Sequence, residues 1–388
     1  MKTVGVITVG RSDYGIYRPV LRSIQSHPDL KLHLIVAGTH LLSRFGSTIE
    51  EIQNDGFPIG ERVNFPLEND SPEGIAQTMG AAVGSFARSY NRFRPDILLV
   101  LGDRFEMHAA VLAALPFKIP VAHIHGGELT YGAFDNALRH SITMFSHLHF
   151  AATEIYRQRI LQLGEEPWRV HLTGAPALDA LVNFKPMALE DLARHFDLPL
   201  TQAPILVTYH PVTLEYENTT WQIDQLLASL SDFPQPIVFT GPNADTHNSI
   251  IGDKIRSFVR ARKNAHLVVN FGSDYYFHML ANAKVMVGNS SSGLLEAPSF
   301  ALPVVNIGSR QEGRIRAKNV IDVGYSKEKI VSGIQKALSA SFRDSLQGMH
   351  NPCDAGGAAT KITECLKTVS LDPKLVFKRF VDHEVRLK

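Results

Sequence analysis

The chain has 388 residues, and its 39 lysines and arginines nearly balance 38 aspartates and glutamates, for a formal net charge of +1. This length suits two or three domains, and such a balanced charge excludes a global basic field for binding nucleic acid or an anionic membrane. The two cysteines, Cys353 and Cys365, argue against a disulfide scaffold and favour the cytoplasm, while no apolar stretch reaches the ~20 residues of a membrane span.

The first half of the chain alternates between short apolar runs and amphipathic segments of helix length. Runs rich in Val, Ile and Leu predict strands at residues 3–9, 32–36, 97–101 and 121–124. Such strands, separated by helices, are typical of a parallel sheet that is covered on both faces. The sequence therefore predicts a doubly wound, Rossmann-like α/β domain over residues 1–174.

The same alternation of apolar runs and amphipathic segments begins again after Gly174 and Pro176, which are residues typical of a break between structural elements. A second Rossmann-like domain is predicted over residues 175–369, and residues 370–388 are expected to form a helix that packs back on the first domain. Two such domains bind ligands in the cleft beyond the carboxyl ends of their strands, so the residues just after each strand matter most. The strands predicted in this second domain lie at residues 205–208, 237–240, 266–269, 285–287 and 304–306.

The first strand runs into the turn Gly10-Arg11-Ser12-Asp13-Tyr14-Gly15. An arginine beside the N–H groups of a helix N-terminus suits a phosphate, so Arg11 is a candidate anion contact. The turn matches neither the dinucleotide fingerprint nor the P-loop. A plain turn with a solvated arginine is the alternative.

Three carboxylates, Asp103, Glu128 and Asp135, fall just beyond predicted strands of the first sheet. Clustered carboxylates raise one another's pKa and can divide acid and base roles, so all three are candidate catalytic residues. Asp103 could instead cap a helix. His123 and His125 have the spacing of a metal pair, but without a clear third ligand no metal is expected.

The segment Gly288-Asn289-Ser290-Ser291-Ser292-Gly293 follows a strand and opens a helix. Its small residues allow a phosphate to approach the backbone, and hydroxyl and N–H groups can donate to it. Ser290, Ser291 and Gly293 are therefore expected at a phosphate, with Glu296 accepting hydrogen bonds from ribose hydroxyls.

Two further candidates follow strands of the second domain. His210 comes after the strand at 205–208, although a core or surface histidine is the simpler interpretation. Arg310 follows the strand at 304–306, and its guanidinium geometry fits a pyrophosphate or a carboxylate. A solvated arginine is the alternative there.

These motifs, in this order, resemble those of the UDP-N-acetylglucosamine 2-epimerase family. Among its branches they are most similar to the hydrolysing enzymes that form N-acetylmannosamine for sialic acid synthesis. The resemblance covers nearly the whole chain and rests on residues 10–15, 101–106, 123–128, 139–140, 210–211, 243–246, 288–293 and 310–311.

The resemblance implies a glycosyltransferase-B-like pair of domains, with UDP on the second domain, no cofactor and a homodimer or homotetramer. It places Ser290, Ser291 and Arg310 at the diphosphate and Glu296 at the ribose. Arg11 would reach across from the first domain. Asp103, Asp135 and His210 would lie at the sugar.

The reaction that the resemblance implies converts UDP-N-acetylglucosamine and water into N-acetylmannosamine and UDP. It proceeds by elimination to a bound 2-acetamidoglucal, followed by hydration. Three alternatives stay open. One is the same reaction on the UDP-linked 2,4-diacetamido-2,4,6-trideoxyglucose of the legionaminic acid route, another a retaining glycosyltransferase of the same fold, and the last a nucleotide-sugar sensor without turnover.

The chain departs from the family pattern at two places. His125 stands where non-hydrolysing relatives carry an acidic residue, so Glu128 is the nearest substitute for that acid or base. Residues 351–356 also differ from the usual turn, which removes support for nucleotide contacts there.

Overall fold

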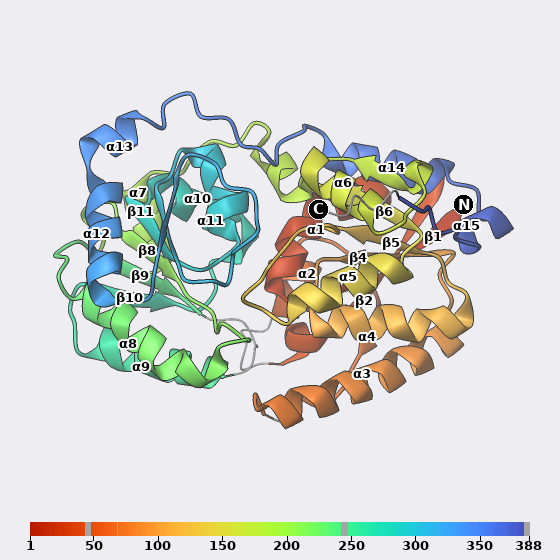
Figure 1. The fold of residues 1–388 in the computed structure, drawn as a ribbon, viewed down its shortest axis with the longest axis horizontal. Helices are drawn as coiled ribbons and strands as arrows, with labels where there is room; N and C mark the ends of the chain where they lie inside the picture. Colours follow the sequence, from red (N-terminus) through yellow and green to blue (C-terminus); the bar gives the residue numbers. More distant parts are fainter. Residues whose placement is uncertain (43–47, 68, 242–246, 384–388) are drawn as a thin grey trace.

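The computed structural model describes residues 1–42, 48–67, 69–241 and 247–383, which form two α/β domains lying side by side (Figure 1). Among these residues, the first sheet has seven strands in the order β3-β2-β1-β4-β5-β6-β7. The second has six, in the order β10-β9-β8-β11-β12-β13. All the strand pairs are parallel, which confirms the predicted class of two doubly wound domains.

The first sheet is centred on strands that are buried on both faces. β1 pairs with β2 from Lys2 opposite Leu30 to Thr8 opposite Val36, and β4 lies on its other side. Every residue of β4 and β5 is buried, which explains their uninterrupted apolar sequences. The strands are β1 (Lys2–Thr8), β2 (Leu30–Ala37), β3 (Ile59–Val63), β4 (Ile97–Leu101), β5 (Val121–Ile124), β6 (Leu148–Ala151) and β7 (Val170–Leu172).

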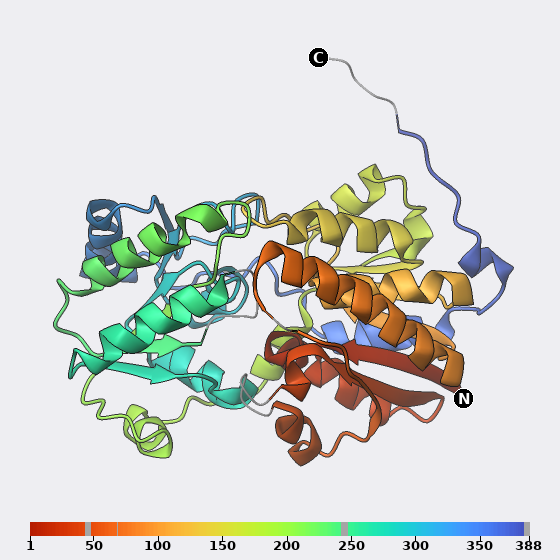
Figure 2. The same ribbon diagram turned by 90° about the horizontal axis from the view of Figure 1, so that it is seen from below.

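Helices cover both faces of the first sheet. One face packs against α1, and the other against α3 and α4, which Figure 2 shows in orange across that face. The bounds are α1 (Arg11–Gln25), α2 (Thr48–Asn54), α3 (Pro72–Arg92), α4 (Phe105–Ala114), α5 (Asp135–Phe145) and α6 (Glu154–Gln162).

The second sheet repeats this arrangement. Helices α8, α9 and α12 supply one buried layer, whereas α7 and α10 supply the other. Its strands are β8 (Ile205–Thr208), β9 (Ile237–Thr240), β10 (Ala265–Val268), β11 (Val285–Gly288), β12 (Val304–Ile307) and β13 (Val320–Val323). Its helices are α7 (Leu189–His195), α8 (Thr219–Leu230), α9 (Asn248–Arg260), α10 (Gly272–Asn282), α11 (Ser292–Leu295), α12 (Lys327–Leu338) and α13 (Ala340–Asp344).

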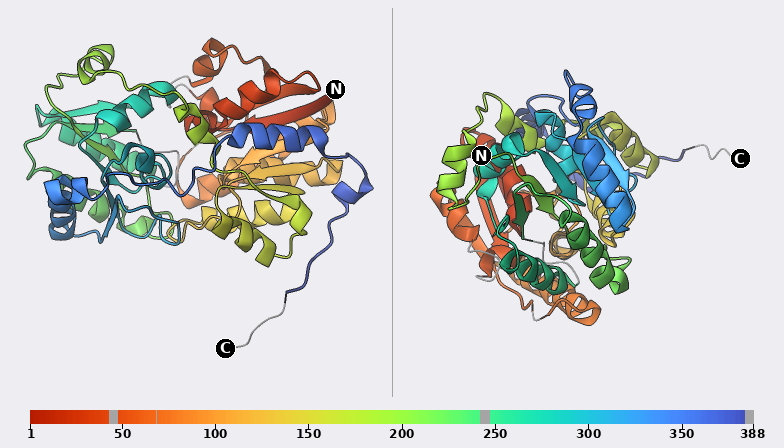
Figure 3. Two further views of the ribbon diagram at one scale, coloured as in Figure 1. Left: turned by 90° about the horizontal axis from the view of Figure 1, so that it is seen from above. Right: turned by 90° about the vertical axis from the view of Figure 1, so that its left-hand side faces the viewer.

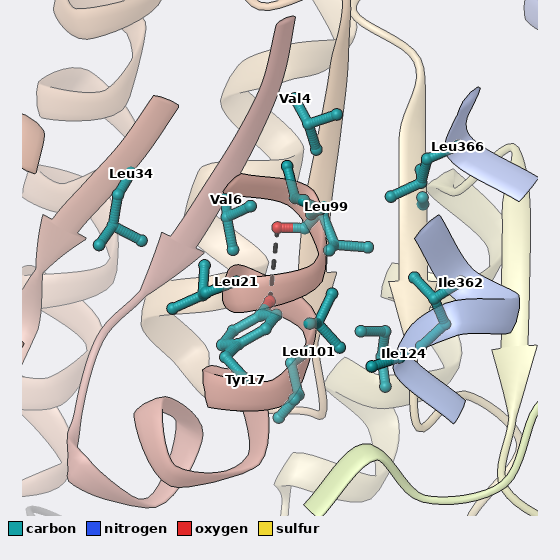
Figure 4. Close-up of a cluster of buried hydrophobic side chains, with 14 of the residues drawn as sticks. Val4, Val6, Tyr17, Leu21, Leu34, Leu99, Leu101, Ile124, Ile362 and Leu366 are labelled. Carbon is teal, nitrogen blue, oxygen red and sulfur yellow. Dashed lines mark hydrogen bonds between the residues drawn. The ribbon is translucent and has the colours of Figure 1, made fainter. Parts of the chain in front are cut away.

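After the second domain the chain returns to the first through α14 (Ala358–Thr368), which lies along that domain in Figure 3. Ile362 and Leu366 of this helix join the core formed by the first sheet and α1 (Figure 4). The apolar face of α14 thus completes the first domain although it lies within residues 175–369.

The tail beyond α14 forms one short helix, α15 (Pro373–Val376), within residues 370–383. Leu375 is buried in the core of the first domain, whereas Phe377 and Phe380 are exposed. The buried Arg169 donates hydrogen bonds to the carbonyls of Lys374 and Leu375, both at 2.8 Å. A short helix that packs on the first domain was expected over this tail, and within residues 370–383 the structure forms a single helical turn that an arginine holds. The domain division at residue 174 remains a prediction.

No helix within the described ranges has both the length and the apolar character needed to cross a membrane.

Candidate active site

A cleft between the two domains is lined by residues that follow strands of both sheets. β1 and β4 are neighbours at the point where the strand order of the first sheet reverses, and β8 and β11 are their counterparts in the second. Ligands of doubly wound domains bind at such points. Nine of the ten predicted site residues lie in the lining: Arg11, Asp103, Glu128, Asp135, His210, Ser290, Ser291, Glu296 and Arg310.

Gly293 is the predicted site residue that the cleft does not include. It lies in α11, where an added Cβ would stand 2.8 Å from Val304 Cγ1. Gly293 therefore serves the close packing of α11 against β12, and a phosphate contact at Gly293 remains a prediction.

Polar contacts connect the two domains at the cleft. Arg18 of α1 donates to Asp274 of α10 at 2.9 Å. Glu51 accepts a hydrogen bond from the backbone N–H of Ser273 at 3.1 Å, in the first turn of α10. A carboxylate at a helix N-terminus is favoured by the helix dipole, so these contacts stabilise the docked arrangement.

Arg139 is the centre of the first domain's side of the cleft. Its side chain is buried, and it pairs with Asp103 and donates to the carbonyl of His125 at 2.9 Å and to Thr130 Oγ1 at 3.2 Å. A buried guanidinium requires such acceptors because losing water is costly. Asp103 is thus fixed by an ion pair, and the alternative role as a helix cap has no support, because Arg104 is the N-cap of α4.

Glu128 lies against positive charge rather than against the other carboxylates. Its Oε1 is 2.5 Å from His125 Nδ1, and its Oε2 is 3.1 Å from Arg314. Burial alone would raise the pKa of Glu128, but Arg314, His125 and Arg139 together outweigh burial and hold that pKa well below its usual range. The expectation that clustering raises the pKa of this carboxylate is therefore wrong. Glu128 stays ionised.

His123 is a structural residue. Its Nε2 lies 2.8 Å from the carbonyl of Gly102 and its Nδ1 lies 3.2 Å from Thr143 Oγ1, so both ring nitrogens are occupied. Within the ranges that the structure describes, no group of three or more His, Cys, Asp or Glu side chains is arranged to hold a metal ion.

His210 is fixed by the buried side chain of Asn289. The amide of Asn289 accepts from the backbone N–H of His210 at 2.7 Å and donates to its carbonyl at 2.8 Å. Burial, with the positive charges of Arg310 and Arg11, holds the pKa of His210 well below its ordinary value. His210 is therefore a neutral hydrogen-bonding group at the cleft.

The turn after β11 approaches β8 closely at Gly288. Its φ is +140°, and an added Cβ would lie 1.9 Å from the carbonyl oxygen of Thr208, so only glycine fits. This close approach places Ser290 and Ser291 in the lining. Burial raises the pKa of Glu296, whose Oε2 has no hydrogen-bond partner among the described residues.

Arg11 crosses between the domains, as expected, but its contacts are to the protein backbone. The guanidinium donates to the carbonyl of Gly241 at 2.6 Å and also to the carbonyl of Val269. In this arrangement Arg11 ties α1 to the ends of β9 and β10 while it lines the cleft.

Several lining residues escaped prediction as site residues because their partners are distant in the sequence. Arg139 is the main example, since it meets its carboxylate partners only in the folded chain. Asp13 is another: its Oδ2 accepts a hydrogen bond from the backbone N–H of Val9 at 3.3 Å, and its side chain is buried. The only available signal for Arg139 and Asp13 was their position in the sequence, because each lies in a motif that follows a predicted strand.

We expect Asp13→Asn to stabilise the protein by an amount that grows from about pH 4 to about pH 8. Burial raises the pKa of Asp13 from 3.8 to about 7, partly opposed by Arg104. The folded state therefore holds this proton more tightly than the unfolded state, and stability falls as pH rises between these values. Above neutral pH, the free energy of unfolding of Asp13→Asn should exceed that of the wild type by ~1–4 kcal/mol, since one pKa unit is ~1.4 kcal/mol.

Chemical denaturation of both proteins at each pH measures this effect. A stability difference that does not change with pH would contradict it.

Two segments that were compared with the family pattern are not part of the cleft as the structure describes it. Residues 243–246 lie outside the described residues. Residues 351–356 do not line the cleft; instead Asn351 donates to the carbonyl of Leu295 at 2.8 Å and supports the turn at α11.

Fold and cleft together define a two-domain α/β protein in which charged side chains of one domain and a Ser-rich turn of the other line a single cleft. Residues 22–367 match the family model of UDP-N-acetylglucosamine 2-epimerase, and the chain belongs to that family.

Relatives span its whole length. The chain is 36% identical to the hydrolysing GDP/UDP-N,N'-diacetylbacillosamine 2-epimerase of Campylobacter jejuni, over 98% of this chain and 99% of the other. It is 33% identical to the hydrolysing UDP-N,N'-diacetylbacillosamine 2-epimerase of Legionella pneumophila, over 96% and 97% of the two chains.

A solved structure has the same fold. UDP-GlcNAc 2-epimerase from Neisseria meningitidis bound to UDP-GlcNAc superposes with a TM-score of 0.80 at 22% identity, over 94% of this chain and 99% of that chain.

Proposed function

We propose that this protein is a hydrolysing 2-epimerase that converts a UDP-linked 2-acetamido sugar and water into UDP and the free 2-epimeric sugar. The observation that carries the proposal is one cleft with acid–base side chains on the first domain facing Ser290, Ser291 and Arg310 on the second. Such an arrangement suits departure of a diphosphate next to a carbon that loses a proton.

The proposed sugar is N,N'-diacetylbacillosamine, a 2,4-diacetamido-2,4,6-trideoxyglucose. The two relatives at 36% and 33% identity, each aligned over nearly its full length, are named for this substrate and for hydrolysis. This reverses the order of the sequence-based expectation, in which UDP-N-acetylglucosamine came first. UDP-N-acetylglucosamine remains the second candidate, since it is bound in the Neisseria meningitidis structure of the same fold.

The chemistry requires two stages in the one cleft. A base removes the proton at C2, the C–H electrons form the C1–C2 double bond, and UDP leaves C1 with its bonding pair. Water then adds to C1 of the glycal while a proton returns to C2 on the opposite face. Asp103 and Asp135 supply acid–base groups, and neutral His210 supplies a hydrogen bond at the second domain's side.

Incubating the purified protein with each UDP sugar alone tests the proposal. We expect release of UDP and the free 2-epimer, with kcat/KM ~10-fold or more higher for the diacetamido sugar, because one substituent contact in a pocket is worth ~10–200-fold. Mass spectrometry and NMR identify the sugar. Turnover only with an added acceptor would indicate a glycosyltransferase, and binding without turnover a sensor; either result would contradict the proposal.

We expect Arg310→Ala to weaken UDP binding about 30-fold, which is ~2 kcal/mol for a lost charge-assisted hydrogen bond. Arg310 lies in the cleft lining near Asn289, to whose carbonyl its Nη1 donates at 3.4 Å. Calorimetry measures the affinity. Arg343→Ala is the matched control, because that arginine donates to the carbonyl of Lys284 outside the cleft. Equal UDP affinity in the wild type and Arg310→Ala would remove Arg310 from the phosphate site.

We further propose a cytoplasmic homodimer or homotetramer, on the family resemblance alone. Light scattering of the purified protein measures its mass. A single 42.9 kDa species at working concentration would contradict this assembly.

A further inference from the structure

His125, which lines the cleft, has an unusual backbone conformation. Its backbone is left-handed, with φ of +65°, a conformation that non-glycine residues rarely adopt. The backbone is held there from both sides, because its N–H donates to the carbonyl of Phe150 at 3.2 Å and its carbonyl accepts from Arg139 at 2.9 Å. Strained residues of this kind cluster at functional sites.

Glu128 fixes the orientation and the tautomer of this ring. The ionised carboxylate of Glu128 can only accept a hydrogen bond, and its Oε1 lies 2.5 Å from Nδ1. Nδ1 therefore carries a proton and donates it to this oxygen. Arg314 holds the other carboxylate oxygen at 3.1 Å. With the proton on Nδ1, the lone pair of the imidazole is on Nε2.

Nε2 of His125 is buried and has no hydrogen-bond partner among the residues that the structure describes. The side chain is only 4% exposed, yet the residue lines the cleft. Buried polar atoms almost always have partners, so an exception in a ligand cleft indicates a group whose partner is the ligand. His123, two residues away, shows the contrast, since both its nitrogens are bonded to protein atoms.

We propose that His125 is the base that removes the C2 proton of the sugar and that Glu128 is its positioning residue. The proposal rests on the proposed epimerase function. The Nε2 lone pair forms a bond to the C2 proton, the C–H pair becomes the C1–C2 double bond, and UDP leaves with the C1–O pair. The imidazolium formed is stabilised by Glu128 and then passes its proton to solvent.

The charged and titratable groups around this ring come from several elements. Glu128 shares its loop, His123 lies on β5, Arg139 on α5, and Arg314 and Glu296 reach it from the second domain. In Glu128→Gln the imidazolium that forms loses its anionic partner, so kcat should fall while KM for the UDP sugar stays near that of the wild type.

The first test is chemical rescue. His125→Gly suits the left-handed backbone and leaves a hole of imidazole size. On the UDP sugar that the wild type turns over, we expect ~1,000-fold lower kcat, within the range for general base catalysis, with UDP affinity unchanged. Added imidazoles should restore turnover in proportion to their basicity, and C2-deuterated substrate should slow the rescued reaction. His140→Gln is the matched control, because His140 does not line the cleft, and its activity should equal that of the wild type.

The outcomes separate the two proposals. If the wild type releases no sugar from any UDP sugar, the proposed function itself fails. If the wild type is active but His125→Gly retains its rate, or imidazole rescue ignores basicity and C2 deuteration, His125 is not the base. Should the glycine variant fail to fold, His125→Asn, which tolerates the left-handed backbone, replaces it. Activity of His125→Asn near that of the wild type would overturn the inference, and a ~1,000-fold loss with intact UDP binding would support it.

Discussion

Asp103→Asn is expected to lower kcat by ~100-fold or more, the scale of lost general acid–base catalysis, and to change the Kd for UDP by less than about threefold. The side chain lies beyond β4 on the first domain's side of the cleft, opposite the Ser-rich turn of the second. Removing its charge leaves the shape intact but abolishes proton transfer and weakens its pair with Arg139. Single-turnover kinetics and calorimetry measure the two effects separately.

Asp322→Asn is the matched control for that variant. Asp322 also pairs with an arginine, Arg316 at 2.6 Å, but neither residue lines the cleft. Its kcat should stay within about twofold of the wild type, as expected for a surface substitution. A kcat for Asp103→Asn equal to that of this control would show that Asp103 takes no part in the chemistry.

Arg139→Met is expected to reduce the free energy of unfolding by ~3–5 kcal/mol and to abolish turnover. The buried guanidinium pairs with Asp103, lies 3.9 Å from Glu128, and holds the carbonyl of His125. Methionine fills a similar volume but leaves the carbonyl and Asp103 without their donor. Denaturant unfolding of both proteins gives the difference.

An exposed arginine provides the comparison. Arg194, whose side chain is 78% exposed, pairs with Asp191, and Arg194→Met should cost less than ~0.5 kcal/mol because water screens such a pair. The double variant Asp103→Asn with Arg139→Met should cost less than the sum of the single changes, since the two residues share one interaction. Additive costs would mean that the ion pair contributes nothing to stability.

Most of the strands that sequence patterns predicted are buried on both faces, although the partly buried β10 was predicted and the fully buried β6 was missed. β4 and β11, for example, are buried at every residue, so their sequences are continuously apolar. The strands that were missed carry polar or exposed positions. β3 contains Glu61, β13 contains the exposed Asp322, and the three-residue β7 ends on the exposed Leu172. Pairing with a neighbouring strand, which no local pattern records, keeps these segments extended.

The candidate site could be predicted from the sequence only where the predicted strands and their order in the sheet were correct. Residues after parallel strands converge on one edge, which is why Asp103 and Ser290 lie in one cleft. Their charge environment was not predictable, because the neighbours of Glu128 include Arg314 from the far domain. The three carboxylates were expected to influence one another, whereas in the fold Asp103 pairs with Arg139 and Glu128 pairs with Arg314. The packing of Gly293 against β12 was not predictable for a related reason, since the side of α11 that faces β12 is set by tertiary packing.

The C-terminal region shows the same limit. The apolar residues of the tail predicted a packed helix over residues 370–388. In the structure α14 makes this packing with Ile362 and Leu366, and the tail contributes the buried Leu375. An amphipathic pattern shows that a helix has a buried face, but not which domain covers it.

Elimination and rehydration at C2 can be followed directly by running the reaction in D2O. If the C2 proton leaves to an enzyme base and another returns on the opposite face from solvent-exchanged groups, each free sugar molecule must carry one deuterium at C2. Mass spectrometry and proton NMR of the purified product measure the deuterium content at C2. Deuterium bound to other carbons serves as the internal control. One deuterium at C2 in the 2-epimeric sugar is the predicted result; a 2-epimer that retains its original hydrogen at C2 would contradict the account, whichever residue acts as the base.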